Sequence, residues 1–162
     1  MIKYILLSLI LTSCVDQKLS RMVHEKEIMK MHEAQREYHF QKMSEEFAGQ
    51  LTDDFISVNR GELSQQSFEE HKARYDRYFA SVEFEKWDDT EKPIIRFSDD
   101  HSLAYTIVQK DVIVRYPDDN GTILRDRVHF AWLAVYRIQK DGNWKIESVA
   151  STNSEPVVNK LD

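Results

Sequence analysis

The side chains best suited to acid–base chemistry in this sequence are three histidines and one aspartate. His32 and His39 lie seven residues apart, so on an unbroken helix they share one face, about 10 Å apart along its axis. The ligands of one zinc ion lie much closer together, so this pair alone is not a metal site. A single pocket histidine can accept a proton near neutral pH. We take His39 as a candidate catalytic residue, with a hydrogen-bonded packing residue as the alternative.

His129 and Asp111 complete the candidates and lie in segments typical of strands. His129 is flanked by apolar residues, where a titratable group must be hydrogen-bonded or lose its charge, so we expect it at a pocket mouth or in a dimer face. Asp111 shares one alternate face of its strand with Tyr105 and Ile107. It could therefore point into a concave sheet, or a bulge at Lys110–Asp111 could leave both charges in solvent.

Several other chemistries are excluded by composition and spacing. Cys14 is the only cysteine, so the rest of the chain has no thiol nucleophile and no thiolate metal ligand. The acidic pairs flank turns but lack the spacing of a calcium loop, and no Gly-rich phosphate loop or Gly-x-Ser-x-Gly elbow occurs. A net charge of −6 argues against nucleic acid as a partner. We expect no metal and no cofactor.

The first residues look like an export signal. Lys3 precedes an apolar run that is too short to span a bilayer, which needs roughly 20 residues. The run ends in Leu11-Thr12-Ser13-Cys14, which resembles a bacterial lipoprotein signal. This resemblance implies a signal peptide over 1–13, palmitate and other acyl chains on Cys14, and a tether over 14–20. The domain would then be anchored to a membrane of the cell envelope, facing the periplasm or the exterior. The alternative is an ordinary secretory signal or membrane anchor with an incidental cysteine.

The elements that position the candidates begin with helices. Residues 19–52 contain no proline and one late glycine, which predicts helix, with a break near 39–44 because the apolar stripe rotates there. Ser44 is the expected cap of the second piece. A further helix is expected to open at Ser64, with Ser67 as an alternative cap. The first apolar stripe is Ile28, Met31, Ala34 and Tyr38.

The rest of the chain predicts strands separated by Asp/Asn/Gly turns, which indicates antiparallel hairpins. Residues 128–138 are apolar on both alternate faces, which is typical of a central strand covered on both sides. We therefore expect an α+β fold in which N-terminal helices pack on a curved antiparallel meander sheet. The expected strands are 55–58, 82–88, 93–98, 102–116, 122–139 and 143–152.

This order of elements resembles the nuclear transport factor 2-like superfamily, also called SnoaL-like. The resemblance rests on Asp53-Asp54-Phe55-Ile56-Ser57-Val58, on Ala131–Arg137, and on Lys140–Ile146 followed by Ser151-Thr152. It implies one domain over 21–153, with a tail over 154–162. It also implies a cone-shaped, cystatin-like roll with a pocket at its open end, and homodimerisation across the sheet.

The superfamily is functionally mixed, so the resemblance implies two functions. The first is binding of a small apolar ligand or a protein partner, with pocket residues expected at Tyr38, His39, Trp87, Tyr105 and Trp132. The alternative is an isomerase, cyclase or dehydratase that uses a pocket His or Asp as its general base. Many members carry a histidine about six residues after the tryptophan matched by Trp144, where this sequence has Ala150.

Overall fold

A computed structural model describes the backbone of residues 2–161 and the side chains of residues 20–161. The expected signal peptide and the side chain of Cys14 lie outside the described side chains. Within the part of the chain that the structure describes, no helix is both long and apolar enough to cross a membrane.

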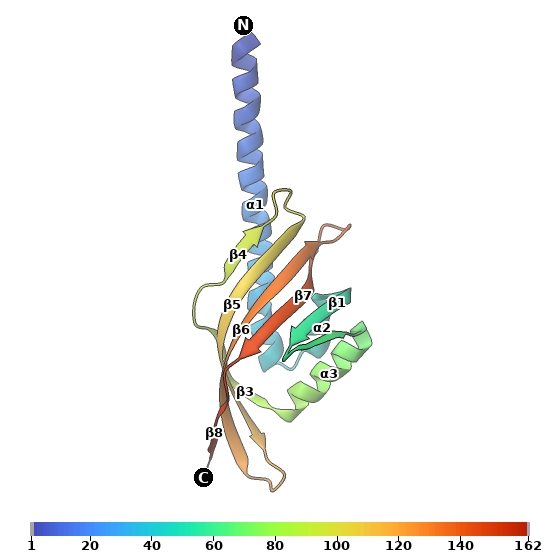
Figure 1. The fold of residues 1–162 in the computed structure, drawn as a ribbon, viewed down its shortest axis with the longest axis vertical. Coiled ribbons are helices and arrows are strands. Elements are labelled where there is room, and N and C mark those ends of the chain that lie inside the picture. Colours follow the sequence, from blue (N-terminus) through green and yellow to red (C-terminus); the bar gives the residue numbers. More distant parts are fainter. Residues whose placement is uncertain (1, 162) are drawn as a thin grey trace.

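The N-terminal region forms two helices with a break where the sequence predicts one. α1 (Ile2–Phe40) extends past the end of the sheet in Figure 1, and α2 (Ser44–Gly49) follows after a short turn. The turn is made by Lys42, whose φ of 58° is left-handed, and by a bond from the Met43 amide to the Tyr38 carbonyl. The expected cap at Ser44 is wrong. Its hydroxyl instead donates to the Asp76 carboxylate and ties α2 to the next helix.

α3 (Phe68–Ser81) begins at a capping box. Ser67 accepts a hydrogen bond from the Glu70 amide, and the Glu70 carboxylate accepts one from the Ser67 amide. The alternative cap is thus confirmed, and the expected start at Ser64 is wrong because Ser64 lies in a strand.

The sheet is curved and mixed rather than purely antiparallel. Its order is β2-β1-β7-β6-β5-β3, with β4 paired to β5 and β8 paired to β6. The expected antiparallel meander is confirmed for β3 to β7. β1 instead joins β7 in parallel, and all other pairs are antiparallel. The sequence did not indicate β2 or β8. The strands are β1 (Leu51–Asn59), β2 (Glu62–Gln65), β3 (Glu83–Asp89), β4 (Ile94–Phe97), β5 (Leu103–Pro117), β6 (Ile123–Ile138), β7 (Trp144–Asn153) and β8 (Val157–Lys160).

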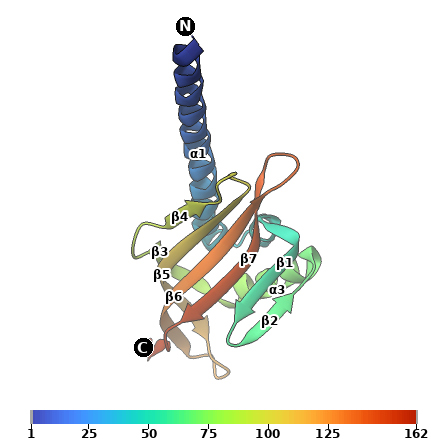
Figure 2. The same ribbon diagram turned by 45° about the horizontal axis from the view of Figure 1, so that its top comes forward.

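The long β5–β6 hairpin is the centre of the sheet (Figure 2). The outer edge of β5 pairs with β4 along residues 104–107 and with β3 along residues 110–115. The outer edge of β6 pairs with β8 along residues 124–127 and with β7 along residues 130–138. β3, β4, β7 and β8 therefore satisfy the backbone hydrogen-bonding groups along the outer edges of β5 and β6.

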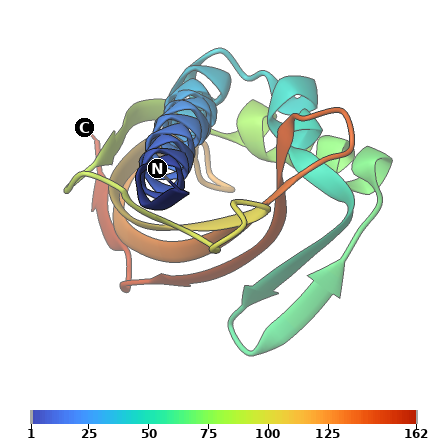
Figure 3. The ribbon, with the colours of Figure 1, turned by 90° about the horizontal axis from the view of Figure 1, so that it is seen from above.

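α1 lies in the concave side of the sheet, as the view along the helix shows (Figure 3). Its buried positions are Ile28, His32, Gln35 and His39, at helical spacing of four, three and four. The expected stripe through Met31, Ala34 and Tyr38 is wrong, since these residues are only half-buried. The core beneath this end of α1 includes Leu51, Phe55, Ile95, Ala104, Ala134, Tyr136, Trp144 and Ile146.

The convex face of the sheet carries a row of apolar side chains that no described element covers. Paired positions form a row that crosses six strands, and its larger members are 39–70% exposed. Residues 128–138 were expected to be covered on both apolar faces. The helices cover the concave face, whereas no described element covers the convex face. We call this set the outer row: Leu63, Val58, Ala150, Leu133, Ile107 and Ile94.

Candidate functional site

The concave side of the sheet and the three helices enclose a cavity of about 720 Å³. All three helices and strands β1, β2, β3, β5, β6 and β7 contribute to its wall. Most of the inner wall is aromatic or aliphatic, and exposed polar side chains of the β1–β2 hairpin and α3 lie at its mouth. The aromatic part includes Phe47, Phe55, Tyr75, Trp87, Phe130 and Trp132.

His39 is the buried histidine of this cavity. Its Nδ1 lies 2.6 Å from the Gln35 carbonyl oxygen, which only accepts, so Nδ1 carries the proton. The neutral ring then keeps a lone pair on Nε2. Burial lowers the pKa of His39 to about 4, against the Gln35 hydrogen bond, and the nearby Lys110 charge lowers it further. At neutral pH the ring is thus an uncharged hydrogen-bond acceptor.

Aromatic rings fix the His39 imidazole in place. It stacks on Trp87 with centroids 4.2 Å apart, and Phe47, Phe79 and Phe84 meet it edge-on at 4.8–5.1 Å. Such a cage leaves little rotamer freedom, so the Nε2 lone pair has a defined direction.

A buried charged cluster lies behind Trp87. The Lys110 ammonium sits 3.8 Å from the Trp87 ring centroid and 2.6 Å from Asp89 Oδ1. His32 donates through Nε2 to the other oxygen of Asp89 at 2.8 Å. Burial lowers the pKa of Lys110. The cluster packs against Trp87, and neither Lys110 nor Asp89 lines the cavity.

Amide and phenol groups supply the other polar atoms of the inner wall. Gln35 donates to the Gln50 side chain at 2.9 Å, and Gln50 in turn donates to the Met31 carbonyl, so the Gln35 amide is fixed. Burial raises the pKa of Tyr75, and burial together with the Asp126 charge raises the pKa of Tyr78 to about 12. Both phenols are therefore neutral donors at ordinary pH.

Three of the five pocket positions expected from the sequence line the cavity: His39, Trp87 and Trp132. Tyr38 lies on the other side of α1, where it lines a separate groove against the β6–β7 turn. Tyr105 is 40% exposed on the convex face. These two placements correct the expectation, and both errors arise from one-residue choices of face on a helix or strand.

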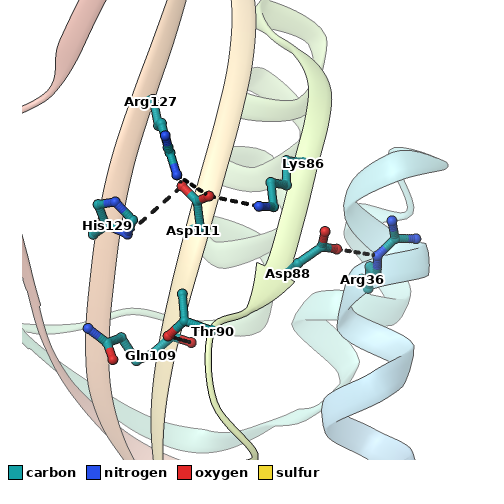
Figure 4. A network of polar contacts seen from close by, with 8 residues as sticks. All are labelled: Arg36, Lys86, Asp88, Thr90, Gln109, Asp111, Arg127 and His129. Carbon is teal, nitrogen blue, oxygen red and sulfur yellow. Dashed lines mark hydrogen bonds and ion pairs between the residues drawn. The ribbon is translucent and has the colours of Figure 1, made fainter.

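Asp111 and His129 lie on the convex face, away from the cavity (Figure 4). Arg127 binds both oxygens of Asp111 at 2.8 Å, and Lys86 donates to Oδ2 at 2.8 Å. These bonds hold the pKa of Asp111 well below its usual range, although burial opposes them. His129 is half-exposed, 3.9 Å from the same carboxylate. Asp111 is thus a structural ion-pair partner.

The expected bulge at Lys110–Asp111 is also wrong. The pairing with β6 continues without a shift, so Lys110 points inward and Asp111 outward. Neither charge is in solvent, because both residues are buried and ion-paired.

Sequence reasoning missed Gln35, Lys110 and two arginines of the mouth, Arg60 and Arg74. Ile28, His32, Gln35 and His39 follow one another at spacings of four, three and four residues, which is typical of one helix face. Because three of the four are polar, a pattern based on apolar residues alone does not include them. Among the side chains that the structure describes, no group of three or more His, Cys, Asp or Glu is placed to hold a metal ion.

No protein-family model matches this chain. No curated protein matches it either. Solved structures do. An NTF2-like protein from Cytophaga hutchinsonii has a TM-score of 0.59 at 19% identity, with 80% of this chain and 98% of that chain covered. A ketosteroid isomerase-like protein from Erwinia carotovora atroseptica has a TM-score of 0.63 at 14% identity, covering 81% and 96%.

A third similar structure is an NTF2-like protein of unknown function in nutrient uptake from Rhodospirillum rubrum. Its TM-score is 0.57 at 16% identity, with 77% of this chain and 96% of that chain covered. The chain therefore has the nuclear transport factor 2-like fold that the resemblance in its sequence implied. At these identities the likeness establishes the fold, and function has to be argued from the site.

Proposed function

We propose that this domain binds a small, largely apolar ligand in the concave cavity. The observation that carries the proposal is an open cavity of about 720 Å³ whose lining residues are mostly aromatic or aliphatic. Ligand sites usually have a volume of about 300–1,000 Å³ and this mixture of side chains. His39 Nε2 and the Gln35 amide supply fixed hydrogen-bonding groups inside, which would orient a polar atom of the ligand.

Binding is favoured over proton-transfer catalysis by the state of the candidate bases. A general base works best when its pKa lies near the working pH, and burial holds the pKa of His39 at about 4. Asp111, the carboxylate considered for the same role, faces away from the cavity. The polar groups inside therefore suit recognition of a ligand better than abstraction of its proton.

Blocking the cavity tests this proposal. Val149→Trp fills the space from β7, whereas Thr152→Trp adds the same ring to an exposed position of that strand. We expect saturable binding of the neutral fluorescent probe N-phenyl-1-naphthylamine by the original chain and by Thr152→Trp, and at least tenfold weaker binding by a folded Val149→Trp. Equal binding by both variants would place the probe elsewhere and contradict the proposal.

We also propose that the chain is a cell-envelope lipoprotein anchored through Cys14, which the sequence Leu11-Thr12-Ser13-Cys14 supports. Several acyl chains on one residue give stable anchoring. Labelled palmitate should be incorporated into the original chain and into Ser20→Ala, but not into Cys14→Ala. Equal labelling of Cys14→Ala would reject the anchor.

The outer row supports a further proposal, that two copies of this domain pair through their convex faces. Monomeric proteins rarely leave so continuous an apolar surface in water. A second copy suits the surface because a two-fold axis places the same row on both sides of the contact. The row crosses the sheet from Leu63 on β2 to Ile94 on β4.

A further inference from the structure

The charged side chains of the cavity lie at its mouth and are mainly basic. Among the described side chains, Arg60, Glu62 and Arg74 are the only Asp, Glu, Lys or Arg residues that line the cavity. All three are exposed at the outer end, on the β1–β2 hairpin and on α3, which lie on the same side of the molecule (Figures 1 and 2). Two cations against one anion contrast with the net charge of −6 for the whole chain.

The two mouth arginines have no carboxylate partner among the residues that the structure describes, which is also true of Arg21, Arg77 and Arg96. The Arg74 guanidinium lies 5.7 Å from the ring centroid of Tyr75, which is itself part of the aromatic wall. Its donors are thus next to the apolar space and unoccupied by an acid. The arginines that do form ion pairs are Arg36, Arg115, Arg125, Arg127 and Arg137.

Arg60 occupies a backbone position that arginine does not favour. Asn59 and Glu62 are paired, so Arg60 and Gly61 form a two-residue hairpin turn, with φ values of 51° and 79°. Such a turn favours Asn before Gly, because Asn tolerates the left-handed conformation better than other side chains. Keeping Arg here costs stability, and an outlier of this kind is a reason to look for function.

We propose that the ligand is an amphipathic acid, with an apolar body in the aromatic part of the cavity and an anionic group held at the mouth by Arg60 and Arg74. This inference rests on the proposed binding function and names the class of ligand. Arginine suits the role because its planar donors match a carboxylate and remain charged at any physiological pH. Glu62 limits the attraction, so removing its charge should strengthen it.

Two probes of the same shape test the proposal: 2-naphthoate, which is anionic, and 2-naphthalenemethanol, which is neutral. Both are measured on the full chain by displacement of N-phenyl-1-naphthylamine. We expect the acid to bind at least fivefold more tightly than the alcohol. Arg74→Gln should weaken binding of the acid three- to tenfold and of the alcohol less than twofold, and Glu62→Gln should strengthen binding of the acid two- to threefold.

Arg60→Asn separates recognition from folding. It should raise or maintain the melting temperature, because Asn suits the turn, and still weaken binding of the acid by the same factor as Arg74→Gln. Arg77→Gln is the control, since Arg77 is exposed on α3 but does not line the cavity. It should leave both probes unchanged.

The outcomes distinguish binding in the cavity from recognition of an anionic group at its mouth. If acid and alcohol bind equally, or if Arg77→Gln acts like Arg74→Gln, the anionic ligand is rejected while binding in the cavity stands. If neither naphthalene probe displaces N-phenyl-1-naphthylamine at millimolar concentration, the anionic ligand is rejected; binding in the cavity is rejected as well only if Val149→Trp binds the fluorescent probe as the original chain does.

Discussion

His39 combines a fixed proton position with burial among aromatic rings. Because the Gln35 carbonyl holds the proton on Nδ1, a ligand inside the cavity meets an acceptor at Nε2. A ligand that donates a hydrogen bond at this depth would leave no polar atom unsatisfied. A ligand that presents a hydrogen-bond acceptor there would leave the Nε2 lone pair without a donor in an apolar site. Such an unsatisfied polar group costs about 1–3 kcal/mol. If the cavity binds a ligand as proposed, the tautomer of His39 would contribute to selectivity.

The low pKa of His39 also makes stability depend on pH. In the unfolded chain His39 takes up a proton near pH 6.5, whereas in the folded chain burial delays this to about pH 4. The unfolded state thus binds more protons between these values, and the free energy of unfolding falls as the pH falls through this window. We expect His39 to account for a loss of about 3 kcal/mol between pH 7 and pH 4.

Urea denaturation at pH 7.0, 5.5 and 4.5 measures this loss. Burial lowers the pKa of His71 as well, so His39→Asn should make the profile shallower without flattening it, while His101→Asn, in a partly exposed turn, should leave the slope unchanged. Parallel profiles for His39→Asn and the original chain would show that His39 does not titrate in this way.

At the scale of elements, the start of α3 depends on one serine. Ser67→Ala removes the acceptor for the Glu70 amide and breaks the capping box, so we expect a loss of about 1 kcal/mol in the free energy of unfolding. Ser64→Ala, three residues earlier in β2, should cost less than half of that. Chemical denaturation of both variants compares them. An equal loss would mean that the helix does not depend on its cap.

An element could be predicted from the sequence when the residues that determine it lie within it or next to it. The five later predicted strands, 82–88 to 143–152, lie within two residues of β3–β7, because turn residues and alternation are encoded next to each strand. The parallel pairing of β1 with β7 joins residues about 90 positions apart, and no local pattern encodes it. β2 and β8 are short and mostly exposed, so they lack apolar alternation.

The site was harder to predict for a related reason. Trp87, Trp132 and His39 were expected in the pocket and line the cavity, since large aromatics in predicted strands have few other places to pack. Lys110 was expected in solvent, yet a partner on another strand, Asp89, and the Trp87 ring make its burial possible. Such compensation appears only once the strands are paired, so a sequence pattern cannot reveal it.

At the scale of the whole molecule, the two proposed contacts, with a ligand and with a second copy, lie on opposite faces of the sheet. The outer row would bury its side chains against a second copy, while the cavity stays open on the concave side. Leu133→Glu places a charge at the centre of the row, and burying an unpaired charge costs several kcal/mol. We expect the original chain to be a dimer by light scattering and Leu133→Glu to be a monomer that still binds N-phenyl-1-naphthylamine.

Gln41→Glu is the matched control, because it adds the same charge at an exposed position between α1 and α2. It should remain a dimer. A monomeric original chain, or a Leu133→Glu variant that stays dimeric, would mean that copies do not pair through this face.

The alternation along β6 also limits how this sequence can change in length. Trp132 faces the cavity and its neighbour Leu133 faces outward. One residue inserted before them would exchange the two faces over the rest of the strand, moving apolar outer residues into the cavity wall and cavity residues into solvent. Insertions in the turns at 118–121 and 140–143 displace no paired strand. Length variants of this domain should therefore accumulate at those turns and be rare within β6.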